Sequence, residues 1–210
     1  MDISGRVQKL HAVMRQNQID IYIVPTSDFH QSEYVGEHFK VREFLTGFTG
    51  SAGTAVFTQN EAFLWTDGRY FIQAAKELEG TPVILMKTGE PGVPSIEQFL
   101  SDHLPKGGAI AFDGRCVSLE SGKLYEKIAA ACQGTVSCEK DLTEGIWTDR
   151  PDLSKEPVWE LDLKYAGEDR ASKLGRIRRA MEEAGADIHM LTTLVDICWI
   201  LNIRRDDVEF

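Results

Sequence analysis

The stretch FLTGFTGSAGTAVFTQNEAFLWTDGRYFIQA, residues 44–74, decides the fold of this chain. Two short apolar runs within it, Thr54–Thr58 and Ala62–Thr66, flank the turn Gln59–Glu61. Two runs of this kind separated by a few polar residues are typical of a β-hairpin. We therefore expect a hairpin here, and the remainder of the chain has to pack around it.

Glycines precede the hairpin at intervals of three residues, at Gly47, Gly50 and Gly53. Glycine permits positive φ and close backbone contact where a Cβ would clash, so we expect these residues to shape a turn. A phosphate-binding loop is not indicated, because the run lacks GxGxxG and no Lys-Ser/Thr follows it. Ser51 lacks the GxSxG spacing of a serine hydrolase nucleophile, and we reject that class.

An acid and a base follow the hairpin, at Asp67 and Arg69, where an amphipathic helix is predicted to begin at Tyr70. Asp67 is the expected N-cap of this helix. Arg69 presents five N–H donors at the carboxyl end of a strand, where open α/β sheets commonly bind ligands. Arg69 is therefore a candidate binding residue, and the alternative is an Asp67–Arg69 ion pair that only stabilises the turn.

Strands and helices alternate on both sides of the hairpin. A helix is expected over residues 4–18 with Ser4 as its N-cap, and another over 118–132 with Leu119, Leu124, Ile128 and Ala131 facing inward. Buried strands are expected at 19–25 and 109–112, a further strand at 82–86, a further helix at 95–104 and a short final strand at 135–138. This alternation predicts an α/β fold, with a mixed β-sheet flanked by helices.

Composition excludes several classes of partner. The chain has 210 residues and a formal net charge of -10, and nucleic acid or an anionic membrane would require a basic face instead. No apolar run reaches the length of a membrane span, and the polar start does not resemble a signal peptide. The four cysteines show no zinc-like spacing, which favours free thiols in a reducing cytoplasm.

One loop, residues 28–38, is rich enough in acids and histidines to be considered for metal binding. His30 and Glu33 would share a face if a helical turn formed there. No other cluster in the sequence supplies further ligands, so a polar loop is the favoured interpretation.

The pattern becomes irregular over residues 142–164 and then begins again. Arg170-x-x-Lys173-Leu174 repeats Arg6-x-x-Lys9-Leu10, and residues 186–191 match the first strand at 19–24. We predict a first domain at 1–141, a linker at 142–164, and the start of a second, similar domain at 165–210. A segment of about 45 residues is too short to bury a core of its own, so we expect the chain to be part of a longer protein. Its tail would pack on the first domain, fray, or pair through an exposed strand edge with another copy as a homodimer.

Several segments in this order resemble the amino-terminal domain of three-domain Xaa-Pro aminopeptidases, of the creatinase and prolidase superfamily. The segments are Gly47–Thr54, Trp65–Ala74, Pro25–Tyr34, Ile146–Pro151, and Trp199–Arg204 followed by Asp207 and Val208. Members of the family usually have glycine where this chain has Arg205, so the backbone there is expected to differ.

The resemblance implies a function for the parent protein, which would remove the first residue from peptides with proline at position two. It implies two divalent ions, usually manganese, in a carboxy-terminal catalytic domain, with no ligands in this chain, which would be inactive alone. It also implies that Arg69 binds the peptide substrate, with Asp67 and Tyr70 supporting it. A metal-free relative, a histone-chaperone subunit, provides the alternative of a non-enzymatic protein-binding module, and an acidic chain would suit a basic partner.

Overall fold

The computed structural model describes residues 1–205, which form two compact units. The first unit comprises Met1–Asp152, and the second begins at Leu153. Residues 207 and 208, which contribute to one family motif, lie outside the described residues, as does the end of the predicted second domain.

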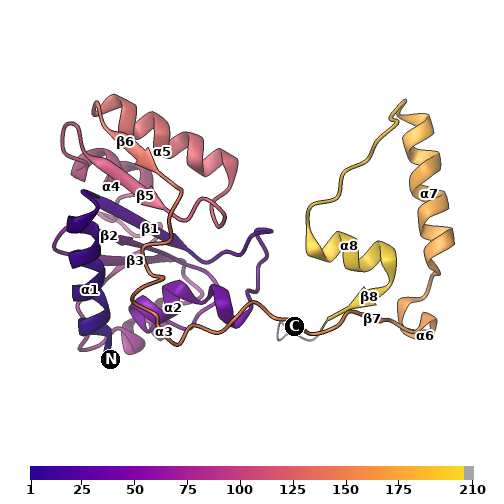
Figure 1. Cartoon of the computed structure of the whole chain (residues 1–210), viewed down its shortest axis with the longest axis horizontal. Helices are drawn as coiled ribbons and strands as arrows, with labels where there is room; N and C mark the ends of the chain where they lie inside the picture. The colour runs from indigo at the N-terminus through magenta and orange to yellow at the C-terminus, as the bar shows by residue number, and fades with distance from the viewer. Residues whose placement is uncertain (206–210) are drawn as a thin grey trace. The chain divides into compact units, whose positions relative to one another are not determined.

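A six-stranded mixed sheet in the order β4-β3-β2-β1-β5-β6 forms the centre of the first unit (Figure 1). Strands β2 and β3 pair in an antiparallel manner and confirm the predicted hairpin, with Ala55 opposite Leu64. Strand β2 also runs antiparallel to β1, whereas the pairs β1–β5, β5–β6 and β3–β4 are parallel. The strands are β1 Ile21–Pro25, β2 Thr54–Phe57, β3 Ala62–Thr66, β4 Val83–Lys87, β5 Ala109–Phe112 and β6 Thr135–Ser137.

Helices cover both faces of this sheet, which confirms the predicted α/β fold (Figure 1). Tyr22 and Val24 face one core together with Leu10, while Ile21 and Ile23 face the other. This alternation follows from the two-residue period of a strand, and it explains why the central strands are apolar throughout. The helices α1 Ile3–Gln16, α2 Val41–Thr46 and α3 Phe71–Glu77 contribute to the first core, and α4 Ile96–His103 and α5 Leu119–Ala131 to the second. A 3-10 turn at Glu37–Phe39 precedes α2.

Two details of the helices differ from prediction. Helix α1 is capped by Asp2, whose carboxylate accepts a hydrogen bond from the Gly5 backbone N–H at 2.9 Å, and Ser4 lies inside the helix. Asp is at least as good an N-cap as Ser, and here it stands two residues earlier. In α5 the inward face is formed by Tyr125, Ile128 and Ala129, and the predicted inward residues Leu119 and Ala131 are exposed.

Few side chains are buried in the second unit, which within residues 153–205 consists of the following strands and helices. They are β7 Trp159–Glu160, α6 Leu163–Ala166, α7 Arg170–Glu183, α8 Leu194–Leu201 and β8 Ile203–Arg204, with β7 antiparallel to β8. Buried Lys173 joins two of the helices, because its Nζ donates to the Trp199 carbonyl at 2.8 Å and to Asn202 Oδ1 at 2.6 Å.

Residues 186–191, predicted as a strand, are not one within the described chain. Ile188 and Met190 in this segment are 83% and 79% exposed. A strand requires a neighbouring strand to pair its backbone N–H and C=O groups, and none lies beside this segment in residues 153–205. Helix α7 does share features with α1, namely 14 residues and an aspartate N-cap, but the division into two similar domains and a linker stays a prediction. No helix within residues 1–205 combines the length and the apolar character needed to cross a membrane.

Candidate functional site

The carboxyl edge of the sheet in the first unit gathers the predicted site residues. Strands β1, β3, β4, β5 and β6 run in the same direction, so the loops that follow them leave from one edge. Strand β2 runs the opposite way, and the glycine-rich turn that precedes it therefore lies at the same edge. This arrangement brings the glycine run and Asp67–Tyr70 together, although 13 residues of hairpin, 54–66, separate them in the chain.

Asp67 holds the Arg69 side chain in one orientation. Its Oδ1 accepts the Arg69 backbone N–H at 3.0 Å and the Nε–H at 2.9 Å, and its Oδ2 accepts from Nη2 at 2.8 Å. The expected N-cap role of Asp67 is wrong, because Tyr70 occupies that position in α3 without a side-chain cap. Helix α3 begins at Phe71, four residues after Asp67, and the Asp67 carboxylate accepts hydrogen bonds from Arg69 instead.

The ion pair is exposed yet strongly coupled. The Arg69 side chain is 64% exposed and that of Asp67 42%. Hydrogen bonds from the Arg69 side chain and backbone lower the pKa of Asp67 to about 2. The pKa of Arg69 is raised first by its hydrogen bond to Asp67 and, to a smaller extent, by the charge of Glu33. Arg69 therefore stays charged and anchored throughout the physiological pH range.

The Tyr70 ring packs against the Arg69 guanidinium. The Arg69 guanidinium lies 5.3 Å from the centre of the Tyr70 ring, and the Tyr70 hydroxyl is 2.7 Å from Ser51 Oγ. Phe48, which is fully buried, meets the same ring edge-on at 5.7 Å between centroids. The Tyr70 ring thus lies between the guanidinium and the core.

Arg42 is a residue of this edge that sequence reasoning missed. It is buried, donates from Nε to Thr26 Oγ1 at 2.7 Å and from Nη1 to the Phe48 carbonyl at 3.0 Å, and also donates to the Gly50 carbonyl. Burial lowers the pKa of Arg42 to about 10. Its position in helix α2 carries no sequence signal for this role, because the carbonyls it binds belong to a turn that cannot be placed from sequence.

The glycines of the turn have the expected geometric roles. Gly47 has φ of +79° at the end of α2. A Cβ at Gly50 would lie 2.3 Å from Phe48 Cζ and 2.7 Å from Tyr70 Cδ1. A Cβ at Gly53 would lie 3.0 Å from the Trp65 carbonyl oxygen. A positive φ at Gly47 and close packing at Gly50 and Gly53 account for these three positions.

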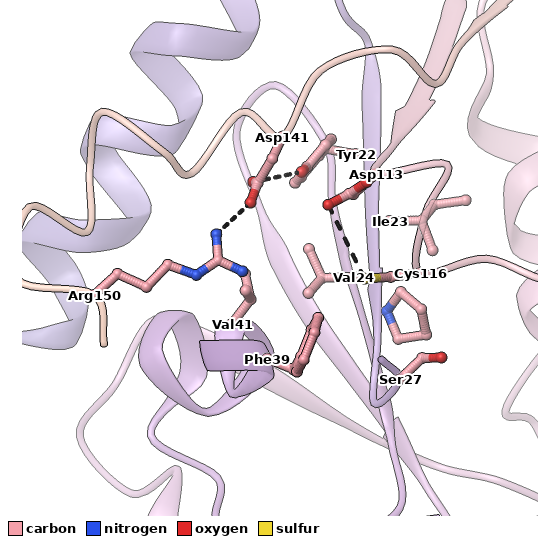
Figure 2. A pocket seen from close by; sticks show the side chains of 11 residues that line it. Tyr22, Ile23, Val24, Ser27, Phe39, Val41, Asp113, Cys116, Asp141 and Arg150 are labelled. Atoms are coloured by element: carbon pink, nitrogen blue, oxygen red, sulfur yellow. Dashed lines mark hydrogen bonds and ion pairs between the residues drawn. The ribbon is translucent and has the colours of Figure 1, made fainter. Parts of the chain in front are cut away.

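A small pocket lies beside the end of β1, and Figure 2 shows its lining. Arg150 Nη1 donates to Asp141 Oδ2 at 2.5 Å, and the Tyr22 hydroxyl donates to Asp141 Oδ1 at 3.3 Å. Burial raises the pKa of the Cys116 thiol, which also lines the pocket, to about 12, so it is not a nucleophile at neutral pH. The polar groups Tyr22, Asp141 and Arg150 thus satisfy one another within the lining.

The acid- and histidine-rich loop does not assemble a metal site among the described residues. Asp28 Oδ1 accepts the backbone N–H groups of His30 and Ser32 at 2.8 and 3.0 Å, and no helical turn forms over 30–33. Nowhere in residues 1–205 do three or more His, Cys, Asp or Glu side chains come close enough to hold a metal ion. The residues present therefore do not fit the two divalent ions that the family resemblance implies.

Comparison with known proteins defines the class. The family model described as the creatinase/prolidase N-terminal domain matches residues 6–144, and a second model with the same description matches residues 149–210. This chain belongs to the creatinase/prolidase N-terminal domain family.

Its relatives are peptidases of greater length. It is 43% identical over 193 residues to aminopeptidase P2 of Arabidopsis thaliana, covering 90% of this chain and 27% of that protein. It is 40% identical to an Xaa-Pro aminopeptidase of Drosophila melanogaster, covering 91% of this chain and 32% of that protein. The chain thus spans about a third of the length of these relatives.

A solved structure agrees with the fold. X-prolyl aminopeptidase from Caenorhabditis elegans, described as a cytosolic enzyme with a di-nuclear active site, superposes with a TM-score of 0.88 at 32% identity. The match covers 99% of this chain and 35% of the worm protein. The chain is therefore homologous to the amino-terminal third of Xaa-Pro aminopeptidases.

Proposed function

We propose that this chain is the non-catalytic amino-terminal part of a metallo-aminopeptidase that removes the first residue from peptides with proline at position two. The names of its relatives from Arabidopsis, Drosophila and Caenorhabditis support this reading. The observation that carries the role of the chain itself is Arg69, whose guanidinium is fixed by Asp67 and still 64% exposed at the carboxyl edge of the sheet.

Arg69 binds the peptide substrate beyond the cleaved bond. Asp67 engages Nε and Nη2, so the edge of the guanidinium formed by the two terminal nitrogens remains open to a carbonyl or carboxylate oxygen. Tyr70 and its bond to Ser51 keep the guanidinium from folding back onto the turn. In this role Asp67 and Tyr70 position Arg69 and make no contact with substrate.

The hydrolytic chemistry resides in another part of the parent protein. The worm relative is described as having a di-nuclear active site, and the described residues of this chain hold no group suited to a metal. We place the divalent ions, manganese in the first instance, in a carboxy-terminal domain, and expect residues 1–210 alone to be inactive. We also propose that the parent protein is cytoplasmic, in line with the cytosolic worm enzyme, and that it forms a homodimer.

The test is to assay the full-length parent and its Arg69→Ala variant for release of the first residue from an Xaa-Pro-Xaa peptide with added manganese. We expect the KM of the variant to rise about tenfold with little change in kcat, because a charged hydrogen bond to substrate is lost. Arg69→Lys, which keeps the charge but not the fork, should fall between the two. Circular dichroism confirms that each variant is folded.

Two results would contradict the proposal. Equal kinetics for the parent and Arg69→Ala would remove Arg69 from the substrate cleft. An inactive parent with every divalent metal tried would make the binding-module alternative the leading one, and the charge of -10 would then direct the search to basic protein partners.

A further inference from the structure

A second Asp-Gly-Arg turn ends strand β5, and its geometry repeats the turn at Arg69. Asp113 Oδ1 accepts the Arg115 backbone N–H at 3.0 Å and the Nε–H at 2.9 Å, and Asp113 Oδ2 accepts from Nη2 at 2.8 Å. The same bonds at Asp67 and Arg69 measure 3.0, 2.9 and 2.8 Å. The carboxyl edge therefore carries two arginines fixed in the same way by their own aspartates.

In both arginines, the side of the guanidinium group formed by the two terminal nitrogens is open. The Arg115 side chain is 60% exposed and that of Arg69 is 64% exposed. Each also lies near an aromatic ring, Arg115 at 5.1 Å from the centre of Phe29 and Arg69 at 5.3 Å from Tyr70. Within residues 1–205 neither guanidinium makes a hydrogen bond or ion pair beyond its own aspartate. Of the five N–H donors in each side chain, the aspartate uses two.

Strand order sets the distance between the two arginines. Strands β2 and β1 lie between β3 and β5, so the strand ends that carry Arg69 and Arg115 are three strand spacings apart. At about 4.8 Å per spacing this is roughly 14 Å, which an extended peptide crosses in about four residues. The loop after β1 comes near both arginines, since the Phe29 ring lies 5.1 Å from Arg115 and the charge of Glu33 contributes to the raised pKa of Arg69.

We propose that Arg115 is a second substrate anchor, which binds the terminal carboxylate of peptides about four residues longer than those that end at Arg69. This inference rests on the proposed function, since it takes Arg69 to face a peptide. An aminopeptidase receives the amino end of its substrate at the cleaved bond, so the carboxyl end extends away from that bond. A guanidinium with an open pair of terminal nitrogens matches a carboxylate with two hydrogen bonds.

A purely structural role for Arg115 predicts different behaviour. If Arg115 only closed the Asp113 turn, its loss would affect every substrate equally, whatever the length or terminal group. Discrimination between a peptide acid and the matching peptide amide isolates the contact with the terminal carboxylate. Lys123, an exposed residue of α5, provides a matched control for the removal of one positive charge.

The experiment measures KM and kcat of the full-length parent, Arg115→Ala, Arg115→Lys and Lys123→Ala on Xaa-Pro peptides of three to ten residues, each as free acid and as amide. In the parent we expect a preference of about tenfold for the acid, expressed in KM and confined to a window of longer peptides. Arg115→Ala should abolish this preference and leave tripeptides unchanged, Arg115→Lys should restore part of it, and Lys123→Ala should retain all of it. An Arg115→Ala variant that keeps the preference, or that loses acid and amide equally, overturns the proposal.

Failure of the proposed function is distinguishable from failure of this inference. If the parent cleaves no Xaa-Pro peptide, the proposed function fails, and binding of the same acid and amide peptides, labelled with fluorescein, is measured by fluorescence anisotropy. An acid preference that Arg115→Ala removes then still supports the carboxylate site. Equal binding of acid and amide overturns it.

Discussion

At the scale of single residues, Gly50 is the position where one added methyl group has the clearest consequence. It lies under the rings of Phe48 and Tyr70, and its carbonyl accepts a hydrogen bond from buried Arg42. We expect Gly50→Ala to destabilise the chain by about 1–3 kcal/mol, the usual range for overpacking, and to displace Tyr70 from beneath Arg69. Urea denaturation gives the free energy of unfolding, and the KM of the full-length parent reports the displacement.

Gly122 in α5 is the control for this substitution, because a Cβ there would meet nothing within 4 Å. Gly122→Ala should stabilise the chain by about 0.5–1 kcal/mol, since alanine is the better helix former. If Gly50→Ala behaves like Gly122→Ala, the packing described around Tyr70 is wrong.

At the residue scale, the sequence predicts Asp67 and Arg69 as partners in one turn, but it misplaces the N-caps of α1 and α3. Asp67 and Arg69 were expected as neighbours at a strand end, and the structure shows them bonded there. The roles of Arg42 and Arg115 were not predicted. Arg42 acts through tertiary contacts, whereas Arg115 carried a readable signal, the second Asp-Gly-Arg after a buried strand.

At the scale of elements, the segment from Asp141 to Arg150 is held against the sheet by one buried cluster of polar groups. Asp141 accepts hydrogen bonds from Thr143 at 2.8 and 2.6 Å and from Arg150, and Arg150 Nε donates to the His38 carbonyl at 2.7 Å. The Asp141 and Arg150 side chains are 5% and 12% exposed. Breaking one partner of such a pair leaves the other charge buried.

We therefore expect Arg150→Ala to lower the free energy of unfolding by about 3 kcal/mol. Asp141→Ala should cost a similar amount, and the double variant should cost less than the sum, because the two residues act through one contact. Denaturant melts of all three variants check this. Additive losses would show that the ion pair contributes nothing beyond its separate contacts.

The same cluster makes the free energy of unfolding depend on pH. Burial opposes the charged form of Asp141, but hydrogen bonds from Thr143 and Arg150 outweigh it and hold the pKa of Asp141 below its ordinary value. The folded state thus binds this proton less tightly than the unfolded state. Asp141 consequently contributes stability above the unfolded pKa of about 4, and this contribution is lost as the pH falls toward and through the folded pKa. Asp141→Ala should flatten that part of the acid denaturation curve.

Predictions for helices and strands are confirmed where apolar residues recur with a regular spacing. They are wrong where contacts with neighbouring elements determine the structure. The hairpin and the buried strands formed as expected because their residues fit only a covered sheet. Residues 186–191 have the same character, yet they form no strand without a partner strand. In α5, Tyr125 and Ala129 turn inward in place of Leu119 and Ala131, since packing against the sheet sets the helix rotation.

At the scale of the whole molecule, the two units differ in how much they bury. The first unit holds two apolar cores, one on each face of the sheet. In α7 of the second unit, Lys173 is the buried residue. Local stability follows buried contacts, so the two units should open with different free energies.

We expect amide hydrogen exchange in residues 1–210 to be orders of magnitude faster in α7 than in β1 or β5. Mass spectrometry of peptic peptides measures the difference. Lys173→Ala should accelerate exchange in α7 and α8 further and leave β1 unchanged, because it removes the bonds to Trp199 and Asn202. Equal protection of α7 and β1 would contradict this assignment.

The sequence does not predict which strands pair with one another in the sheet. The alternation of elements predicts a mixed sheet with flanking helices, but β1 pairs with β5 across more than 80 intervening residues, 26–108. That pairing depends on how the connecting helices cover both faces. The candidate site is therefore not predictable from sequence either, because the strand order is needed to place Arg69 and Arg115 at one edge of the sheet.

The aspartates that hold Arg69 and Arg115 also bear on the thermodynamics of any ligand. A free arginine side chain samples many rotamers and loses that freedom when it binds. Here hydrogen bonds to Asp67 and Asp113 already restrict the rotamers, so this side-chain entropy is lost when the chain folds and not when a ligand binds. Ligand binding at this edge is therefore expected to carry a smaller entropic cost, because the side chains are already in the conformation that the ligand meets.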